Sequence, residues 1–417
     1  MIPPSVGQQE LFSTADETSL TPICWSYGMG VESTAGVYRT IVDPAWRPPE
    51  LLPDLSNLIV MIAQTGDEWT DTVRLVERHM LPVLRRHHVR LVEVARAGPS
   101  EADGIVILQD TRTPTQLHAD PVKYDFFSLS QEHRRNGVMP QLGGRRLCSA
   151  KAKGFPLDAW RKHALGHRQY IHAVGFNCDE TGRIAGDASV TMGGQRRPIY
   201  PLHERNCSRQ ECLDYLLKVF RVQWVKSCCR QCCFAGSRAG WPAQLARYQA
   251  YPAESAHHVV DEFVTVALNK ESGLFGPKDT LADRLARGDA AEALRLARRQ
   301  VRGTAWAIYR VRRLLWPPAP SWRSVQTVRR GDMPSMHAFL RELADRLELS
   351  LDVHAGHARL WLAHRVPDTS PTFEEFFVAA PAQVVDKQRP GFETRWRGHA
   401  DDRLLAREDH VADLLAA

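Results

Sequence analysis

The sequence predicts an α/β protein, with a doubly wound and mostly parallel sheet in its first part and an Arg-rich, mainly helical C-terminal region. Apolar runs typical of buried strands alternate with amphipathic segments up to about residue 220. A glycine- and hydroxyl-rich turn follows the first apolar run, and Arg-rich helical patterns predominate after about residue 256. With 417 residues, 43% hydrophobic and 24% charged, the chain has the composition of a globular protein of about two to three domains.

The alternation gives the elements in chain order. We expect strands at residues 22–27, 58–64, 90–94 and 170–176, and helices at residues 32–41, 70–87 and 208–220. The last helix begins with Ser208 and Glu211 at capping-box spacing. Near the C-terminus we expect a helix at residues 336–347 and a strand pair at 349–353 and 357–363.

The turn after the first predicted strand has the composition of an anion-binding loop. It reads Ser26, Tyr27, Gly28, Met29, Gly30, Val31, Glu32, Ser33, Thr34. A turn at a helix start presents backbone N–H groups and the positive end of the helix dipole to a phosphate. Gly28 and Gly30 let the backbone curl and approach the ligand closely, while Ser26, Ser33 and Thr34 add hydroxyl donors. No Gly-Lys-Ser/Thr follows, so the spacing differs from the Walker A motif. An ordinary helix-capping glycine turn is the alternative.

A second polar turn follows the predicted strand at residues 58–64. It contains Thr65, Gly66, Asp67 and Glu68. In a parallel sheet this turn and the first loop lie at the same edge, where ligands bind. Asp67, Glu68 or Glu32 could hold Mg²⁺, which prefers carboxylate and phosphate oxygens. Acids that merely begin a helix are the alternative for Asp67 and Glu68.

Four basic residues are candidates to offset phosphate charge, because Arg offers bidentate donors and Lys a point charge. They are Lys153, Arg145, Arg146 and Arg183.

The motifs and the change in composition along the chain divide it into three expected parts. We expect a flexible leader at residues 1–20, a nucleotide-binding α/β domain with a cysteine cluster at 21–255, and a mainly helical basic region with a small α+β segment at 256–417.

Four cysteines crowd into six residues: Cys228, Cys229, Cys232 and Cys233. A C-x-x-C turn such as that of Cys229 and Cys232 directs two thiolates at one centre, and a tetrahedral centre needs two more. Zn²⁺ or a [4Fe–4S] cluster would both suit all-thiolate ligation. Buried thiols without a metal are the alternative.

The segment from Arg284 to Arg330 is strongly basic. It holds twelve Arg against Asp289 and Glu292, with Trp306, Tyr309, Trp316 and Trp322 interleaved. This pattern is typical of a surface that meets DNA or RNA, and a solvated helix face is the alternative. The sequence contains no apolar run long enough to span a membrane and no recognisable signal peptide, so we expect a cytoplasmic protein without a membrane partner.

Five segments in this order resemble the PP-loop family, in its phosphoadenosine phosphosulfate reductase-like branch, which includes the sulfur-transfer enzymes of DNA phosphorothioation. They are residues 26–34, 57–72, 145–157, 174–202 and 226–234. The resemblance covers about residues 22–236, and Glu32 stands where an Asp is common in the family. It implies a PP-loop (HUP-like) fold, with the nucleotide held by the loop, by the turn at residues 65–68 and by Gly175 in Val174-Gly175-Phe176. It also implies Lys153, Arg146, Asp67 and Arg183 as catalytic residues.

The resemblance favours Cys148 as the third ligand beside Cys229 and Cys232; the fourth stays open among Cys228, Cys233, Cys207 and Cys212. The family's thiol-dependent reductases use a cysteine near the C-terminus, and no cysteine follows Cys233. We therefore expect an enzyme that cleaves ATP to pyrophosphate, adenylylates an acceptor, and transfers sulfur or another nucleophile. Its partners would be an adenine nucleotide, a nucleic acid, and a sulfur- or electron-donor protein. The alternatives are a sulfonucleotide reductase that uses an external thiol, and a non-catalytic nucleotide-sensing subunit that binds nucleic acid.

Overall fold

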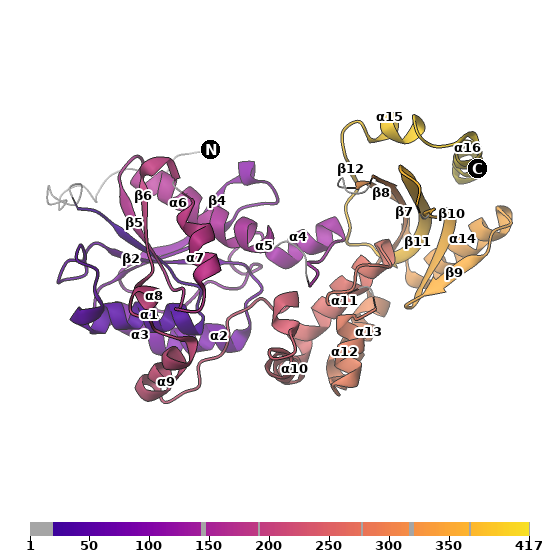
Figure 1. Ribbon diagram of the computed structural model, residues 1–417. Coiled ribbons are helices and arrows are strands. Elements are labelled where there is room, and N and C mark those ends of the chain that lie inside the picture. Colours follow the sequence, from indigo (N-terminus) through magenta and orange to yellow (C-terminus); the bar gives the residue numbers. More distant parts are fainter. Residues whose placement is uncertain are drawn as a thin grey trace, which may run out of the picture. The chain divides into compact units, whose positions relative to one another are not determined.

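A computed structural model describes residues 20–142, 147–190, 192–276, 278–316, 321–366 and 368–416 (Figure 1). The chain forms two compact units. The first comprises residues up to 129 together with 147–229, and the second comprises residues 130–146 together with 230–417. The predicted boundary at residue 255 is therefore wrong, because the helices that precede it pack in the second unit; the change in composition on which the prediction relied occurs later in the chain. The predicted leader falls almost entirely on residues 1–19, outside the described residues.

The first unit is built on a six-stranded sheet in the order β4-β3-β2-β1-β5-β6. All neighbours are parallel except β3 and β4, which are antiparallel. The strands are β1 (Ile23–Ser26), β2 (Leu58–Gln64), β3 (Arg90–Arg96), β4 (Ile105–Thr111), β5 (Tyr170–Val174) and β6 (Arg196–Ile199). The four strands expected from the sequence are confirmed, whereas β4 and β6 were not expected. The mostly parallel sheet agrees with the predicted fold class.

Helices cover both faces of this sheet, because alternate residues of each strand point to opposite sides. Ile23 and Trp25 of β1 belong to the core with α1 (Val31–Val42) and α9 (Arg209–Phe220). Cys24, between them, belongs to a separate core with α6. The remaining helices of the unit are α2 (Thr70–Leu75), α3 (Leu81–Arg86), α5 (Leu147–Ser149), α6 (Phe155–Leu165), α7 (Thr181–Ala188) and α8 (Pro201–Glu204).

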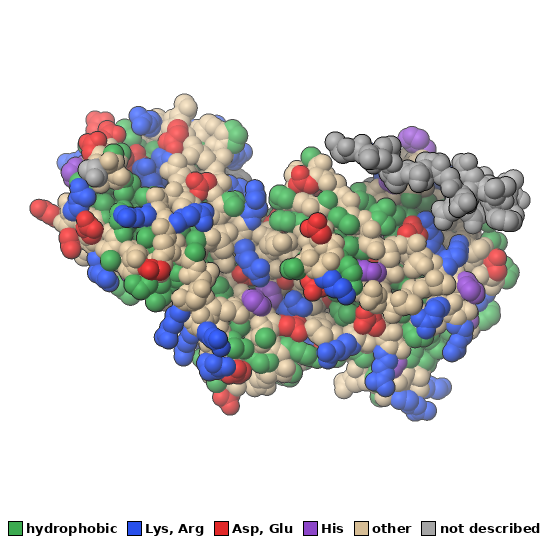
Figure 2. All heavy atoms as spheres, turned by 180° about the vertical axis from the view of Figure 1, so that it is seen from behind, with side chains coloured by type: hydrophobic (Ala, Val, Ile, Leu, Met, Phe, Trp, Pro, Cys, Tyr) green, Lys and Arg blue, Asp and Glu red, His purple; other side chains and the backbone are tan. Residues whose placement is uncertain are grey.

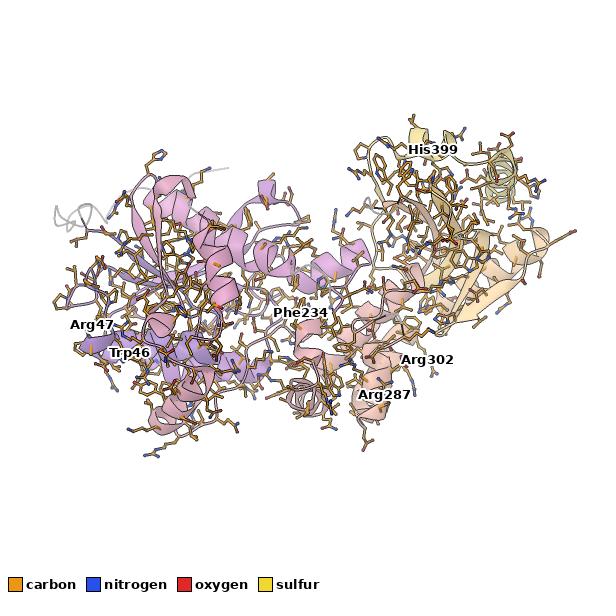
Figure 3. All side chains as sticks on the ribbon, viewed as in Figure 1. Trp46, Arg47, Phe234, Arg287, Arg302 and His399 are labelled. Carbon is orange, nitrogen blue, oxygen red and sulfur yellow. The ribbon has the colours of Figure 1, made fainter. Side chains whose placement is uncertain are left out.

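The helix expected at residues 70–87 is interrupted by a π-helical turn, Val76–Met80, between α2 and α3. A second π-helical turn, Ala150–Gly154, precedes α6 and contains Lys153. The capping box at the start of α9 is confirmed: Ser208 Oγ accepts from Glu211 N, and the Glu211 carboxylate accepts from Ser208 N. Arg47 donates to the carbonyl oxygens of Thr40 and Ile41 at the C-terminal end of α1 (Figure 3). The guanidinium thus meets the negative end of the α1 dipole.

The second unit contains a six-stranded sheet in the order β12-β8-β7-β11-β10-β9, with all described pairs antiparallel. The strands are β7 (Trp306–Leu315), β8 (Trp322–Gly331), β9 (Leu351–His354), β10 (His357–Ala363), β11 (Thr372–Pro381) and β12 (Lys387–Gln388). The predicted hairpin of β9 and β10 is confirmed, and its turn residues Ala355 and Gly356 both have positive φ. The prediction of a mainly helical region is wrong at β7, β8 and β11, three long strands that were not expected, whereas the helix and strand pair expected between β8 and β11 are present.

β7 was not predicted as a strand because it has arginine residues in its middle, and arginine is rarely buried. The structure neutralises these side chains from other elements: Arg310 pairs with Glu375 and Glu408, and Arg313 pairs with Glu374. The helices of the second unit are α4 (Leu129–Asn136), α10 (Trp241–Ala250), α11 (Pro252–Leu268), α12 (Leu281–Arg287), α13 (Ala291–Gly303), α14 (Met333–Arg346), α15 (Phe392–Arg397) and α16 (Asp402–Ala416). Among the helices that the structure describes, none combines the length and apolar character that a membrane crossing requires.

Candidate functional site

The loop expected to bind phosphate connects the end of β1 to the start of α1. Gly30 is the N-cap of α1 and has no side chain with which to cap it. The residue with positive φ is Met29, at 60°, whereas Gly28 and Gly30 do not have positive φ. A Cβ at Gly28 would lie no nearer than 4.0 Å to another atom, and one at Gly30 no nearer than 3.7 Å. The curl itself therefore does not require these glycines, and Gly30 serves as the N-cap of α1.

Three loop side chains face the core of the first unit. Tyr27, Met29 and Thr34 are buried, and Tyr27 Oη lies 3.1 Å from Thr34 Oγ1. The expectation that Thr34 offers a hydroxyl to a phosphate is therefore wrong for this conformation, because the Tyr27 hydroxyl already engages it. Ser33 Oγ donates to the Gly30 carbonyl oxygen at 3.3 Å. Ser26 remains the hydroxyl that is partly exposed and is not bonded within the loop.

Ser227 connects the turn after β2 to the loop at residues 26–34. Ser227 Oγ donates to the Gly28 carbonyl oxygen at 2.7 Å and lies 3.4 Å from Glu68 Oε2. Lys153 Nζ donates to Glu68 Oε1 at 2.9 Å, and the Glu68 side chain is fully buried. The Gly28 carbonyl oxygen and the side chains of Glu68, Lys153 and Ser227 thus form one hydrogen-bonded group. Only Ser227 was not predicted as a site residue; its position next to the cysteine cluster was the available signal.

Gly66 is required by its surroundings. It has φ of +74°, and a Cβ there would lie 2.5 Å from Ser128 Cβ and 3.1 Å from a Pro121 carbon. Asp67 beside it is buried, and its backbone N–H donates to Thr65 Oγ1 at 3.3 Å. The turn is therefore rigid, and it presents the carboxylates of Asp67 and Glu68 at the carboxyl end of β2.

Gly175, which follows β5, packs directly on the start of α1. A Cβ there would lie 2.8 Å from Ser33 Cα and 3.0 Å from Ser33 N. Glu32 forms an ion pair with Arg209, as Glu68 does with Lys153, so both of these Mg²⁺ candidates already have a cationic partner in this structure. Arg183 pairs with Glu180 and is more than half exposed. Arg145 and Arg146 lie outside the described residues.

A buried polar chain behind the loop was not anticipated. Ser26 Oγ lies 2.7 Å from His172 Nε2, and Arg196 Nε donates to His172 Nδ1 at 2.7 Å. Burial, with Arg161 and Arg196 nearby, holds the pKa of His172 well below its usual range. The available signal was a histidine within the apolar run predicted as β5.

The predicted metal ligands are distributed over both units. Cys148, Cys228 and Cys229 belong to the first unit, and Cys232 and Cys233 to the second. Cys229 Sγ lies 3.8 Å from Thr65 Oγ1, and Cys229 forms an isolated β-bridge with Glu68. Within the described parts of the chain, no group of three or more His, Cys, Asp or Glu side chains is arranged to hold a metal ion. The Zn²⁺ or [4Fe–4S] assignment therefore stays a prediction from the C-x-x-C spacing.

Two alternatives for the fourth ligand lose support. Cys207 and Cys212 are buried in the core of the first unit, with their Sγ atoms 3.6 Å apart. Burial raises the pKa of both thiols, which disfavours the thiolate that a metal requires.

The exposed basic surface of residues 284–330 is smaller than the arginine content of this segment suggests. Outside β7, Arg284 and Arg287 pair with Asp279. On α13 the arginines recur at helical spacing on one exposed face, where they line a shallow hollow with Gly303; they are Arg295, Arg298, Arg299 and Arg302. Figure 3 labels Arg302 on α13 and Arg287 on α12. Figure 2 shows Lys and Arg side chains interspersed with Asp and Glu over the face drawn there. The largest group of exposed arginines in this segment is therefore on α13, and a smaller group, Arg329 and Arg330 of β8, lines a second hollow beside Asp386.

The first unit thus brings together a glycine loop at a helix start, the ion pair of the buried Glu68 with the partly exposed Lys153, and an acidic turn, all at the carboxyl end of the parallel strands. No protein-family model, curated protein or solved structure matches this chain.

Proposed function

We propose that the first unit is a PP-loop nucleotide site and that the protein is an ATP pyrophosphatase that adenylylates an acceptor for sulfur or nucleophile transfer. The proposal is carried by the hydrogen bonds that connect the Gly28–Gly30 loop to the end of β2. Ser227 bonds to the Gly28 carbonyl oxygen and to Glu68, and Lys153 pairs with Glu68. Backbone N–H groups at the start of α1 suit the pyrophosphate part of ATP, and the two glycines leave room for its oxygens. The family assignment rests on the order of the five sequence segments.

The chemistry needs the phosphates held and their charge offset while an acceptor attacks. An acceptor oxygen attacks the α-phosphorus, the bond from that phosphorus to the bridging oxygen breaks, and pyrophosphate leaves. A sulfur or other nucleophile then displaces AMP from the acceptor. Asp67 and Glu68 are the residues that would hold Mg²⁺, which would offset phosphate charge when bound. Glu68 would then exchange its ion pair with Lys153 for the metal, and the Lys153 charge would become available to the phosphates.

Alanine at Gly28 or Gly30 tests the site without disturbing the fold. The added Cβ has no close neighbour in the protein, so the melting temperature should stay within about 2 °C, since such a site creates no overpacking. The methyl group would instead occupy space that the phosphates need, so ATP affinity should fall by about tenfold or more. Gly182→Ala in α7, where a Cβ also meets nothing within 4 Å, is the matched control.

The reaction is tested with α-labelled ATP and Mg²⁺ in the presence of candidate acceptors. Release of pyrophosphate, or transfer of the label to an acceptor, supports the proposal. Absence of ATP binding together with absence of turnover contradicts it. Stabilisation by a phosphosulfate nucleotide but not by ATP would instead select the reductase alternative.

A nucleic-acid acceptor is the second part of the proposal, and the exposed face of α13 supports it. Arg298, Arg299 and Arg302 are exposed, and no acidic partner is recorded for them among the described side chains. Cations at this spacing suit the phosphates of a polynucleotide backbone, which is recognised without base contacts. If nucleic acid binds but ATP does not, the non-catalytic alternative is favoured.

A further inference from the structure

A chain of hydrogen bonds in the first unit runs from β6 through β5 to the phosphate loop. Ser26, the last residue of β1, has its Oγ 2.7 Å from Nε2 of His172 on β5. On the other side of the ring, Arg196 Nε donates to Nδ1 of His172 at 2.7 Å. His172 is 8% exposed and lies in the sheet, so water does not take the place of these partners.

Arg196 is itself held in place. Its guanidinium forms an ion pair with Asp187 and donates to the carbonyl oxygens of Asp187 and Val190, both at 2.9 Å. Tyr200 Oη donates to the same Asp187 carboxylate at 2.9 Å. Arg196 therefore has one defined orientation toward His172.

This arrangement decides which nitrogen of His172 carries the proton. A guanidinium only donates hydrogen bonds, so Nδ1 must present its lone pair to Arg196. A neutral imidazole has a single N–H, which must then be on Nε2 and point at Ser26 Oγ. Ser26 Oγ accepts that hydrogen bond, so its own hydroxyl proton is directed to another acceptor.

We propose that His172 and Arg196 are positioning residues that turn the Ser26 hydroxyl into a donor to an anionic oxygen of the ligand in the loop at residues 26–34. This inference rests on the proposed nucleotide site and deepens it, because it assigns the loop a side-chain donor beside its backbone N–H groups. The same geometry excludes Ser26 as a nucleophile activated by His172. The pair has the spacing of a Ser–His dyad, but the lone pair that would take the serine proton faces Arg196.

The tautomer is directly measurable in the full-length protein. In protein labelled with ¹⁵N-histidine, long-range ¹H–¹⁵N correlation spectra should show His172 protonated at Nε2, and this form should persist below the pH at which an exposed histidine takes up a second proton, because the group is buried. His172→Gln identifies the resonance and keeps an amide donor toward Ser26. A proton on Nδ1 overturns the inference.

The ligand role is tested by binding of ATP and of inorganic pyrophosphate, measured by calorimetry. Ser26→Ala and His172→Leu should each weaken binding by about 10- to 100-fold, as expected for one hydrogen bond to a charged group. Because His172 acts through Ser26, the double variant should bind no more weakly than Ser26→Ala alone. His172→Gln should retain most of the affinity, and His163→Leu, at an exposed histidine of α6, is the control for the loss of an imidazole.

Additive losses in the double variant, or unchanged affinity in Ser26→Ala, overturn the inference while leaving the nucleotide site intact. Failure of the native protein to bind either probe overturns the proposed function, and the ligand role of Ser26 with it. Melting temperatures of all variants show whether His172→Leu simply unfolds. If it does, the affinities of Ser26→Ala and His172→Gln still show whether His172 orients the Ser26 hydroxyl toward the ligand.

Discussion

Lys153 Nζ lies 2.9 Å from Glu68 Oε1, so a cation from the π-helical turn before α6 neutralises a fully buried carboxylate at the end of β2. The pair joins two segments separated by 85 residues in the sequence. Removing one charge from such a pair leaves the other without its partner in a region of low dielectric.

Lys153→Met should lower the free energy of unfolding of the first unit by about 1–3 kcal/mol, less than for a fully buried pair because Lys153 reaches solvent. Glu68→Gln in the same chain should recover part of this loss, since no buried charge then remains. Urea unfolding measures both, with Lys162→Met at an exposed position of α6 as the control. Equal stability of Lys153→Met and Lys162→Met would contradict the pairing.

Gly175→Ala should displace the start of α1. The new Cβ would approach the Ser33 backbone to 2.8 Å, and backbone atoms cannot move aside as a side chain can. We expect a loss of about 1–3 kcal/mol in stability, typical of overpacking. ATP affinity should also fall by about tenfold or more, because the misplaced N–H groups no longer face the phosphates. Calorimetry and thermal unfolding report the two effects, and an unchanged affinity would show that Gly175 does not support the loop.

Acid should destabilise the second unit through His357. Burial, with a contribution from Arg359, lowers the pKa of His357 to about 3. Between about pH 6.5 and pH 3 the unfolded chain therefore binds a proton that the folded chain does not, so stability is fully present above pH 6.5 and falls as the pH decreases. The loss approaches about 1.4 kcal/mol per pH unit for this one group.

His357→Gln removes this titration. The difference in melting temperature between the native protein and the variant should therefore shrink as the pH is lowered from 7 to 5, which scanning calorimetry can follow. The same substitution at the exposed His354 of β9 is the control. A difference that does not depend on pH would contradict the assignment.

Charge reversal on α13 should weaken nucleic-acid binding. Arg298, Arg299 and Arg302 changed together to Glu should reduce the salt dependence of binding, lowering the slope of log K against log salt by about 2–3. Fluorescence anisotropy with single-stranded and duplex DNA and RNA between 50 and 200 mM salt would measure it. Arg341, Arg346 and Arg403 changed to Glu give a control with the same change in net charge. Equal weakening in both triple variants would indicate a general charge effect and no docking on α13.

The cysteine motif predicts a bound metal. Protein purified without oxygen should contain either iron with a brown colour, as a [4Fe–4S] cluster requires, or zinc without colour. Cys148→Ser and Cys229→Ser should each abolish the metal content, whereas Cys178→Ser should not. Elemental analysis and visible absorption give the result, and a metal-free native protein would leave the cluster as ordinary thiols.

The sequence predicts those elements of the fold whose pattern lies within a few consecutive residues. Residues 58–63 are all apolar because β2 is buried on both faces. Ser208 and Glu211 mark the start of α9 through the hydrogen bonds of a capping box. The edge strand β4 was not predicted because its apolar run covers only residues 105–108 and none of its residues is fully buried. The Arg-rich strand β7 was missed because Glu374, Glu375 and Glu408, which neutralise it, come from distant residues.

The sequence by itself determined the β1-loop-α1 and β2-turn segments, because an apolar run followed by turn-forming residues is a local pattern that marks the end of a buried strand. Only the tertiary structure decided which side chains serve them. In the folded chain Thr34 is buried against Tyr27, and Glu32 forms an ion pair with Arg209. Ser227 and His172 form hydrogen bonds to the loop. Except for Thr34 with Tyr27, these pairings join residues far apart in the chain. The packing of the sheet and its helices selects them, so no local sequence pattern predicts them.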